Sequence, residues 1–168
     1  MKSFFIYLIL ALLFLVIESA LLYPILPSFL IPDVLLIMVF YLGFSNRSTS
    51  GALTSFSLGY IADVFSGGII GTSSFTLVCI FAITSLLAKI VSLNSVLIKI
   101  GGTIFMSILK GLLTYILIRL LNQEIPFYII LLPSVFTGIV SPFIFNLFKK
   151  IELKAKVAAY HTMKKIEL

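Results

Sequence analysis

The sequence of 168 residues has no tryptophan, one cysteine and one histidine, and only 11% of its residues are charged. The single cysteine, Cys79, excludes an internal disulfide and a paired cysteine metal site. With His161 as the one histidine, we expect neither a metal centre nor a cofactor. A nucleophile with a neighbouring base, a phosphate-binding glycine loop and paired catalytic acids are also missing. The sequence therefore predicts a protein that is not an enzyme.

Apolar residues, in contrast, make up 61% of the chain, against roughly 45–50% in soluble domains. A helical span needs about 20 apolar residues, and the sparse charges divide the chain into six such blocks, at about 3–23, 33–44, 49–66, 69–88, 95–121 and 125–148. This pattern predicts an all-α integral membrane protein with a six-helix transmembrane domain at 1–148 and a basic tail at 149–168. The block at 33–44 is short, so either the proline-rich segment before it enters the membrane or the bilayer thins around it.

The distribution of lysine and arginine predicts the orientation, because cytoplasmic loops retain positive charge. If the N-terminus is inside, Arg119 is the one basic residue in the outer segments. The inner segments hold the lysines of the tail together with Lys2, Arg47, Lys89 and Lys99. We therefore expect a multi-pass protein with both termini in the cytoplasm. The first span begins like a signal peptide, but its length favours an uncleaved anchor.

The tail at 149–168 reads KKIELKAKVAAYHTMKKIEL and has six lysines and two glutamates. Its charge is thus +4, out of a formal net charge of +6 for the whole chain. Juxtamembrane lysines are attracted to anionic headgroups by about 1 kcal/mol each. We expect an anchor on anionic lipid, with a docking site for a cytoplasmic partner as the alternative. Nucleic-acid binding is not expected, because the tail offers no folded basic surface with aromatic stacking positions.

A regular stripe of small and acidic residues lies in the stretch SGALTSFSLGYIADVFSGG at 50–68, where every fourth residue is Gly51, Ser55, Gly59, Asp63 and Gly67. Residues four apart share one face of a helix, and small residues at this spacing let membrane helices pack closely. The span at 95–121 has a similar stripe in Thr103, Ser107 and Gly111. We expect both spans to be inner helices, packed against each other or against a partner's helix.

Charged residues inside the predicted spans point to function by default, because they are costly in a bilayer. Asp63 lies near the outer end of its span, Glu18 in the outer part of the first span, and Lys110 near the middle of the fifth. A long lysine can reach along its helix, so Lys110 can pair with Glu18 or with Asp63. Asp33, which follows Pro32, is expected to cap the helix that it opens.

The outer turn after Asp63 contains Ser66 followed by Gly67, Gly68 and Gly71. Glycines supply backbone conformations that other residues resist, and clusters of them mark turns. They also leave room for a neighbour to approach. This turn is therefore either a simple connection or a contact surface.

Together, these motifs resemble the bacterial rod shape-determining protein MreD family. The resemblance covers about residues 30 to 75 and rests on Pro32-Asp33, Asn46-Arg47, Asp63 and the glycines Gly51, Gly59, Gly67, Gly68 and Gly71. Length, span number, cytoplasmic termini and the basic tail are also similar to that family. Thr72-Ser73-Ser74 departs from its pattern, which bears on local turn contacts.

The resemblance implies a non-enzymatic scaffold of the cell-elongation machinery, in the bacterial cytoplasmic (inner) membrane, that helps to maintain rod shape and to guide lateral peptidoglycan synthesis. It implies MreC as the direct partner, with RodA, a penicillin-binding transpeptidase and, indirectly, MreB nearby; a homo-oligomer stays open. MreC would bind the stripe and the outer turn, unless these serve internal helix packing.

The family's fold is similar to the six-helix substrate-binding component of energy-coupling-factor transporters. The alternative function is therefore the substrate-binding membrane subunit of such a vitamin transporter. That function needs a polar pocket near the outer face, to which Asp63, Tyr60, Ser66 and Arg119 could contribute.

Overall fold

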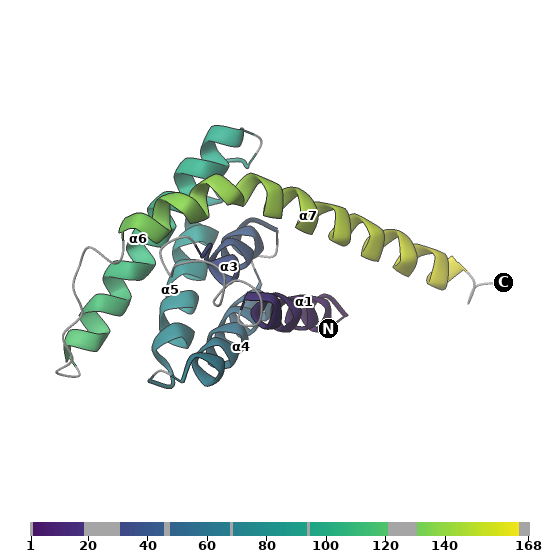
Figure 1. Cartoon of the computed structure of the whole chain (residues 1–168). Helices are drawn as coiled ribbons and strands as arrows, with labels where there is room; N and C mark the ends of the chain where they lie inside the picture. Colours follow the sequence, from purple (N-terminus) through teal and green to yellow (C-terminus); the bar gives the residue numbers. More distant parts are fainter. Residues whose placement is uncertain are drawn as a thin grey trace.

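The computed structural model describes residues 2–18, 31–45, 48–67, 69–93, 95–120 and 131–164. This part of the chain has six helices and no strand, which confirms the all-α prediction for it. The helices are α1 (Lys2–Ile17), α3 (Val34–Ser45), α4 (Thr49–Ser66), α5 (Thr72–Leu87), α6 (Val96–Leu120) and α7 (Leu131–Lys164) (Figure 1). Each predicted span overlaps one helix. Gly68, Asn46-Arg47, and the parts of the predicted spans at 19–23 and 125–130 lie outside the described residues.

Helix α3 forms the centre of the bundle and packs against α4, α5, α6 and α7 (Figure 1). Its residues from Val34 to Phe40 are all buried, as is Leu42. A helix that is apolar on every side is enclosed by protein or by lipid, and here other helices enclose it. With 12 residues it is about 18 Å long, shorter than the roughly 30 Å of a bilayer core. The weakest predicted span is thus the core helix, whose sides face protein.

Helix α4 has small and polar residues on its inner side and large apolar residues on its exposed side, the reverse of a helix in a soluble protein. Gly51, Ser55, Gly59 and Asp63 are buried, so the small-residue stripe faces the interior. The large apolar residues of the opposite face are exposed by half or more: Leu53, Phe56, Tyr60 and Val64. Water disfavours such a surface, whereas lipid tails are as apolar as leucine and accept it. This arrangement supports a membrane setting for α4.

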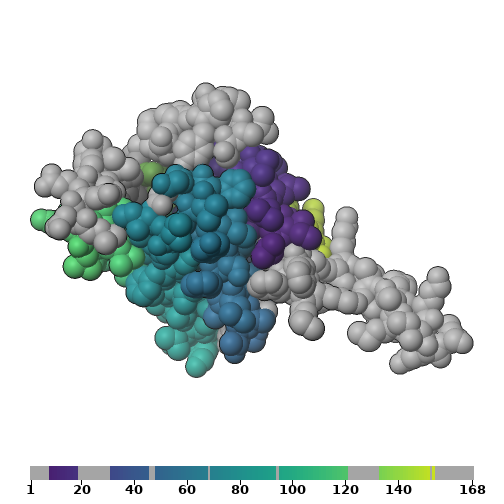
Figure 2. Space-filling view, turned by 90° about the horizontal axis from the view of Figure 1, so that it is seen from below, coloured from purple at the N-terminus to yellow at the C-terminus, as the bar shows by residue number. Residues whose placement is uncertain are grey.

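Gly59 brings α4 against the start of α5. A Cβ at this position would lie 2.3 Å from Cα of Ser74 and 2.6 Å from the carbonyl oxygen of Ser73. Both are backbone atoms, which cannot move aside as a side chain does. Only glycine therefore permits this approach, and the stripe of α4 is filled here by a helix of the same chain. Helix α1 packs on α4 as well (Figure 2).

Helix α6 packs against α7, α5 and α3. Its stripe residues Thr103 and Ser107 are buried, and Gly102 lies against the ring of Phe40 on α3. On α7, Gly138 approaches the side chain of Ile104. The small-residue stripes of α4 and α6 thus serve different helix contacts. Within the described residues, α6 is the one helix that is both long and apolar enough to cross a membrane, and α1, α3 and α5 contain shorter apolar segments.

Helix α7 runs unbroken for 34 residues and extends beyond the bundle (Figure 1). Pro142 lies inside it and has no N–H for the carbonyl of Gly138, four residues earlier. The hydroxyl of Ser141 donates to that carbonyl at 2.7 Å instead. The change from apolar domain to basic tail at 148/149 is therefore a change in composition within one helix.

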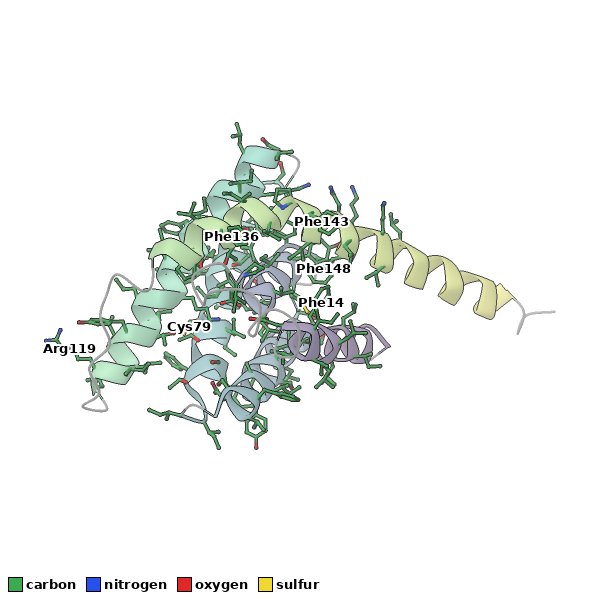
Figure 3. All side chains as sticks on the ribbon, in the orientation of Figure 1. Phe14, Cys79, Arg119, Phe136, Phe143 and Phe148 are labelled. Carbon is green, nitrogen blue, oxygen red and sulfur yellow. The ribbon has the colours of Figure 1, made fainter. Side chains whose placement is uncertain are left out.

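Aromatic rings of α1, α3 and α7 pack against one another. Phe14 of α1 meets Phe148 of α7 edge to face, with centroids 6.2 Å apart (Figure 3). Tyr41 of α3 lies 5.8 Å from Phe148 and 5.9 Å from Phe145. Such pairs contribute about 0.5–1.5 kcal/mol beyond the area that they bury. They join α1 to α7 and α7 to α3.

Candidate functional site

A cavity of about 530 Å³ lies where one set of helix ends meets. Its described walls are the ends of α1 and α4, the beginnings of α3, α5 and α7, and the middle of α6. The lining residues are Leu15, Glu18, Ile31, Asp33, Leu35, Ala62, Phe65, Ser66, Ser73, Lys110 and Pro133. Two acids and one base thus face a space whose other walls are mainly apolar.

Asp33 organises this end of the bundle through three bonds. Its Oδ1 accepts a hydrogen bond of 2.9 Å from the backbone N–H of Leu36, which caps α3. Its own N–H donates to Oγ1 of Thr137 on α7 at 3.1 Å. Its Oδ2 forms an ion pair with Nζ of Lys110 on α6. One aspartate therefore joins the start of α3 to α6 and α7.

The ion pair of Lys110 differs from the sequence expectation, which offers Glu18 and Asp63 as partners. The structure joins Lys110 to Asp33, because the start of α3 lies against the middle of α6, where the lysine projects. The two side chains are 21% and 29% exposed, on the lysine and the aspartate respectively. Glu18 lines the same cavity as both members of the pair. The three charges therefore form one cluster.

Asp63 lies outside this cluster and is 1% exposed. Its Oδ2 accepts from the N–H of Gly71 at 2.7 Å, and its Oδ1 accepts from the N–H of Ser73 at 3.0 Å. The hydroxyl of Thr72 is 3.4 Å from Oδ1. These N–H groups belong to the beginning of α5, where four backbone donors have no partner within the helix. The carboxylate of α4 thus caps its neighbour.

The turn between α4 and α5 requires glycine at two positions. Gly67 ends α4 with φ 63°, and Gly71 precedes α5 with φ 103°. Both angles are left-handed, which costs other residues roughly 1–2 kcal/mol. A Cβ at either position would meet no atom within 4 Å. The turn is therefore closed by backbone geometry and leaves open space beside it.

Sequence reasoning missed the roles of Thr137 and Ser73. Thr137 is fully buried and accepts the Asp33 N–H while donating to the carbonyl of Pro133 at 2.7 Å. No local pattern marks it, because its partner is 104 residues away. Ser73 had a signal, because N–H groups at a helix start need acceptors and the acid Asp63 lies in the last turn of the preceding helix, just before the glycine turn.

The residues that the transporter alternative would use do not converge. Tyr60 is 50% exposed, on the side of α4 that faces away from the bundle. Arg119 points away from the bundle (Figure 3) and donates to the hydroxyl of Tyr115 at 2.9 Å. Ser66 lines the cavity, whereas Asp63 caps α5. The polar lining of the cavity comes chiefly from Glu18, Asp33 and Lys110.

Among the described residues, no group of three or more acids, cysteines and histidines is placed so that it could hold a metal ion. Within that part of the chain, the cavity combines an ion pair, a second acid and two serine hydroxyls. This set can bind a polar group by charge and hydrogen bonds.

The interior small-residue stripe, the exposed apolar face of α4 and the apolar α6 are typical of a helical membrane protein. The model of one family, the rod shape-determining protein MreD, matches residues 1–151. The chain belongs to this family, a family of membrane proteins that determine rod shape and are not known as enzymes. Comparison with curated proteins and with solved structures gave no match.

Proposed function

We propose that this protein is a non-enzymatic membrane scaffold of the cell-elongation machinery, which binds MreC and helps to guide lateral peptidoglycan synthesis. The observation that carries the proposal is the family match over residues 1–151, which includes α1 to α6 and α7 as far as Ile151, the third residue of the tail. RodA, a penicillin-binding transpeptidase and MreB would be reached through MreC. A scaffold needs surfaces for partners and no reacting groups.

The proposed topology has six spans in the inner membrane and both termini in the cytoplasm. The described helices support it by their alternation: the ends of α1 and α4 meet the beginnings of α3, α5 and α7 around one cavity. With a cytoplasmic N-terminus, this end of the bundle is the outer one. The lysines of α7 then lie at the inner surface, where anionic headgroups attract them.

We propose that the partner contacts the outer corner, the turn from Phe65 to Gly71. The stripe of α4 cannot accept a second helix at Gly59, because α5 already fills that place. At the outer corner, Phe65 and Ile70 are 53% and 66% exposed, and the glycines leave open space. Apolar residues at a membrane surface, beside room for another chain, suit the outer juxtamembrane segment of MreC.

Co-purification tests this proposal. The tagged chain is recovered from gently solubilised membranes, and MreC is quantified by mass spectrometry. Ile70→Ser should reduce MreC recovery severalfold. Ile90→Ser is the matched control, because Ile90 is 86% exposed at the opposite end of the bundle, and it should leave recovery unchanged. Equal recovery from both variants would remove the outer corner as the contact surface.

The cavity supports the second candidate, a substrate-binding subunit of an energy-coupling-factor transporter. Its volume of about 530 Å³ lies within the roughly 300–1,000 Å³ of small-molecule sites. The same co-purification separates the two functions. An ATPase pair with its membrane coupling subunit in place of MreC would establish the transporter.

A further inference from the structure

The cavity and the outer corner share a wall. Phe65 and Ser66 belong to both, and Ala62 continues the shared wall by one turn of α4. The cavity is accessible from outside the protein, because Phe65 is 53% exposed and the side chains of Asp33 and Lys110, which also line it, are 29% and 21% exposed. A chain that contacts the outer corner therefore has the cavity within reach of its side chains.

The walls and the volume of the cavity favour a large apolar group. Much of the described lining is apolar: Leu15, Ile31, Leu35, Ala62, Phe65 and Pro133. Such walls favour an apolar occupant, because contact with it removes apolar surface from water. A cavity of about 150 Å³ can already bind benzene, and this one has about 530 Å³. It has room for a large aromatic side chain and for part of the chain that carries it.

The polar groups of the cavity favour an aromatic side chain that can donate a hydrogen bond. Glu18 and Asp33 offer carboxyl oxygens, and Ser66 and Ser73 offer hydroxyl oxygens. A carboxyl group has an acceptor oxygen whether or not it is ionised. The indole N–H of tryptophan and the O–H of tyrosine need such an acceptor when they are buried. Phenylalanine or leucine would cover these oxygens without bonding to them, which is unfavourable.

The depth of the cavity in the membrane favours the same two side chains. The cavity lies where the ends of α1 and α4 meet the beginnings of α3, α5 and α7. The ends of membrane helices lie near the boundary between hydrocarbon and water. Tryptophan and tyrosine are enriched at this boundary. The outer juxtamembrane segment of a membrane-anchored partner passes through the same layer.

We propose that the cavity receives an anchor residue of the partner, a tryptophan or tyrosine in the outer juxtamembrane segment of MreC. This inference rests on the proposed function, because it names the group that the partner at the outer corner inserts. The ring packs against the apolar walls, and its N–H or O–H donates to a carboxyl or hydroxyl oxygen of the lining. A few such anchors, each seated in a pocket, supply most of the binding energy of an interface.

Photo-crosslinking in cells identifies the occupant. The photoreactive residue p-benzoylphenylalanine replaces Phe65, which lines the cavity, or Phe56, which lies further from the outer corner on α4. The two positions are matched, because both phenylalanines are 53% exposed. Mass spectrometry should map the crosslinks from position 65 to a stretch of MreC just outside its membrane helix that contains a tryptophan or tyrosine. Crosslinks from position 56 should not reach that stretch.

Two results of this experiment would overturn the proposal. Crosslinks from position 65 to lipid alone would make the cavity a lipid site. Crosslinks to a stretch of MreC that has neither tryptophan nor tyrosine would show that the anchor is of another kind.

A variant that fills the cavity tests the same contact by co-purification. Ala62→Phe places a ring in the cavity and should reduce MreC recovery severalfold. Ala82→Phe is the matched control, because Ala82 is exposed on α5, and it should leave recovery unchanged. The melting temperature in detergent shows whether each variant is folded. Wild-type recovery with folded Ala62→Phe protein would overturn the proposal, and the crosslinks decide it if this variant does not fold.

A change in the partner measures the strength of the anchor. Replacing the crosslinked aromatic residue of MreC by alanine should weaken the complex about thirtyfold, the loss that is typical of an interface anchor. An unchanged dissociation constant would overturn the proposal.

The failure of this inference differs from the failure of the proposed function. If the wild-type protein and folded Ala62→Phe recover MreC equally, the cavity is not the contact and the scaffold function stands. If the wild-type protein recovers no MreC, both proposals are wrong.

Discussion

Two aspartates, Asp63 and Asp33, lie at the same end of the bundle and both receive the N–H groups at a helix start, yet their surroundings differ. Asp63 is 1% exposed and accepts from two backbone N–H groups of the turn into α5. Asp33 accepts from one backbone N–H, pairs with Lys110 and faces a cavity. The first carboxylate has protein partners alone, whereas the second has an open side.

The packing around each aspartate accounts for the difference. Gly59 lets α4 and α5 approach closely, and Asp63, one turn further along α4, is 1% exposed. Around Asp33, five helix ends surround a cavity that the short α3 does not fill. Close packing surrounds Asp63 with protein, whereas the cavity leaves one side of the Asp33 cluster open.

Forcing α4 and α5 apart at Gly59 should lower the stability most. In Gly59→Leu, a side chain would meet the backbone of Ser73 and Ser74, so we expect destabilisation of at least about 3 kcal/mol and loss of folded protein in detergent. The matched control is Gly101→Ala in α6, where a Cβ meets nothing and alanine favours the helix. A folded Gly59→Leu protein with an unchanged melting temperature would contradict the α4–α5 contact.

Removing Asp33, which faces the cavity, should have the next largest effect on stability. Asp33→Ala takes away the cap of α3 and leaves Lys110 without its partner. We expect a loss of about 2–3 kcal/mol, less than the roughly 3–5 kcal/mol for a fully buried pair, because both side chains are partly exposed. The melting temperature in detergent measures it.

The double variant Asp33→Ala/Lys110→Met sharpens this prediction. It removes both charges, so it should recover part of the stability that Asp33→Ala loses. A double variant that is less stable than the single one would show that the lysine stabilises the bundle without the aspartate.

Neutralising Asp63, between α4 and α5, should lower the stability less. Asp63→Asn keeps an oxygen acceptor for the start of α5 but loses the negative charge that favours a helix N-terminus. We expect a decrease of about 1–2 kcal/mol, measured as the melting temperature in detergent. An unchanged melting temperature would contradict the role of Asp63 as the cap of α5.

The smallest effect should come from the turn itself. Gly67→Ala places a side chain in open space but at φ 63°, so we expect a loss of about 1 kcal/mol from backbone strain alone. Gly67→Asn should lose less, because asparagine tolerates this conformation. Equal melting temperatures for the two variants would argue against strain as the cause.

Much of the fold was readable from the sequence, because apolar blocks between charges mark helices directly. The predicted span at 49–66 coincides with α4, and that at 95–121 differs from α6 by one residue at each end. The last span was predicted to end at 148, whereas α7 continues to Lys164. Composition changes at that point and helix-forming residues continue, so hydropathy marked the end of the apolar part and not the end of the helix.

The site was less readable, because its groups come from distant parts of the chain. The sequence indicated Glu18 and Asp63 as possible partners of Lys110, and Asp33 as a helix cap. It did not indicate the pair of Lys110 with Asp33, since the two residues are 77 positions apart and their contact depends on how α3 lies against α6. Nor could it separate a stripe that packs internally from one that binds a partner, because both need the same small residues.

The sequence alone determined the helices, the membrane class and the family, since these follow from hydropathy, periodicity and local motifs. The tertiary structure decided which helix is central, that Gly59 receives α5, that Asp63 caps its neighbour and that Lys110 pairs with Asp33. Those outcomes depend on which helix faces meet. In a chain whose helices are nearly all apolar, a few small and charged residues decide how the faces meet, and their partners appear only once the helices are packed.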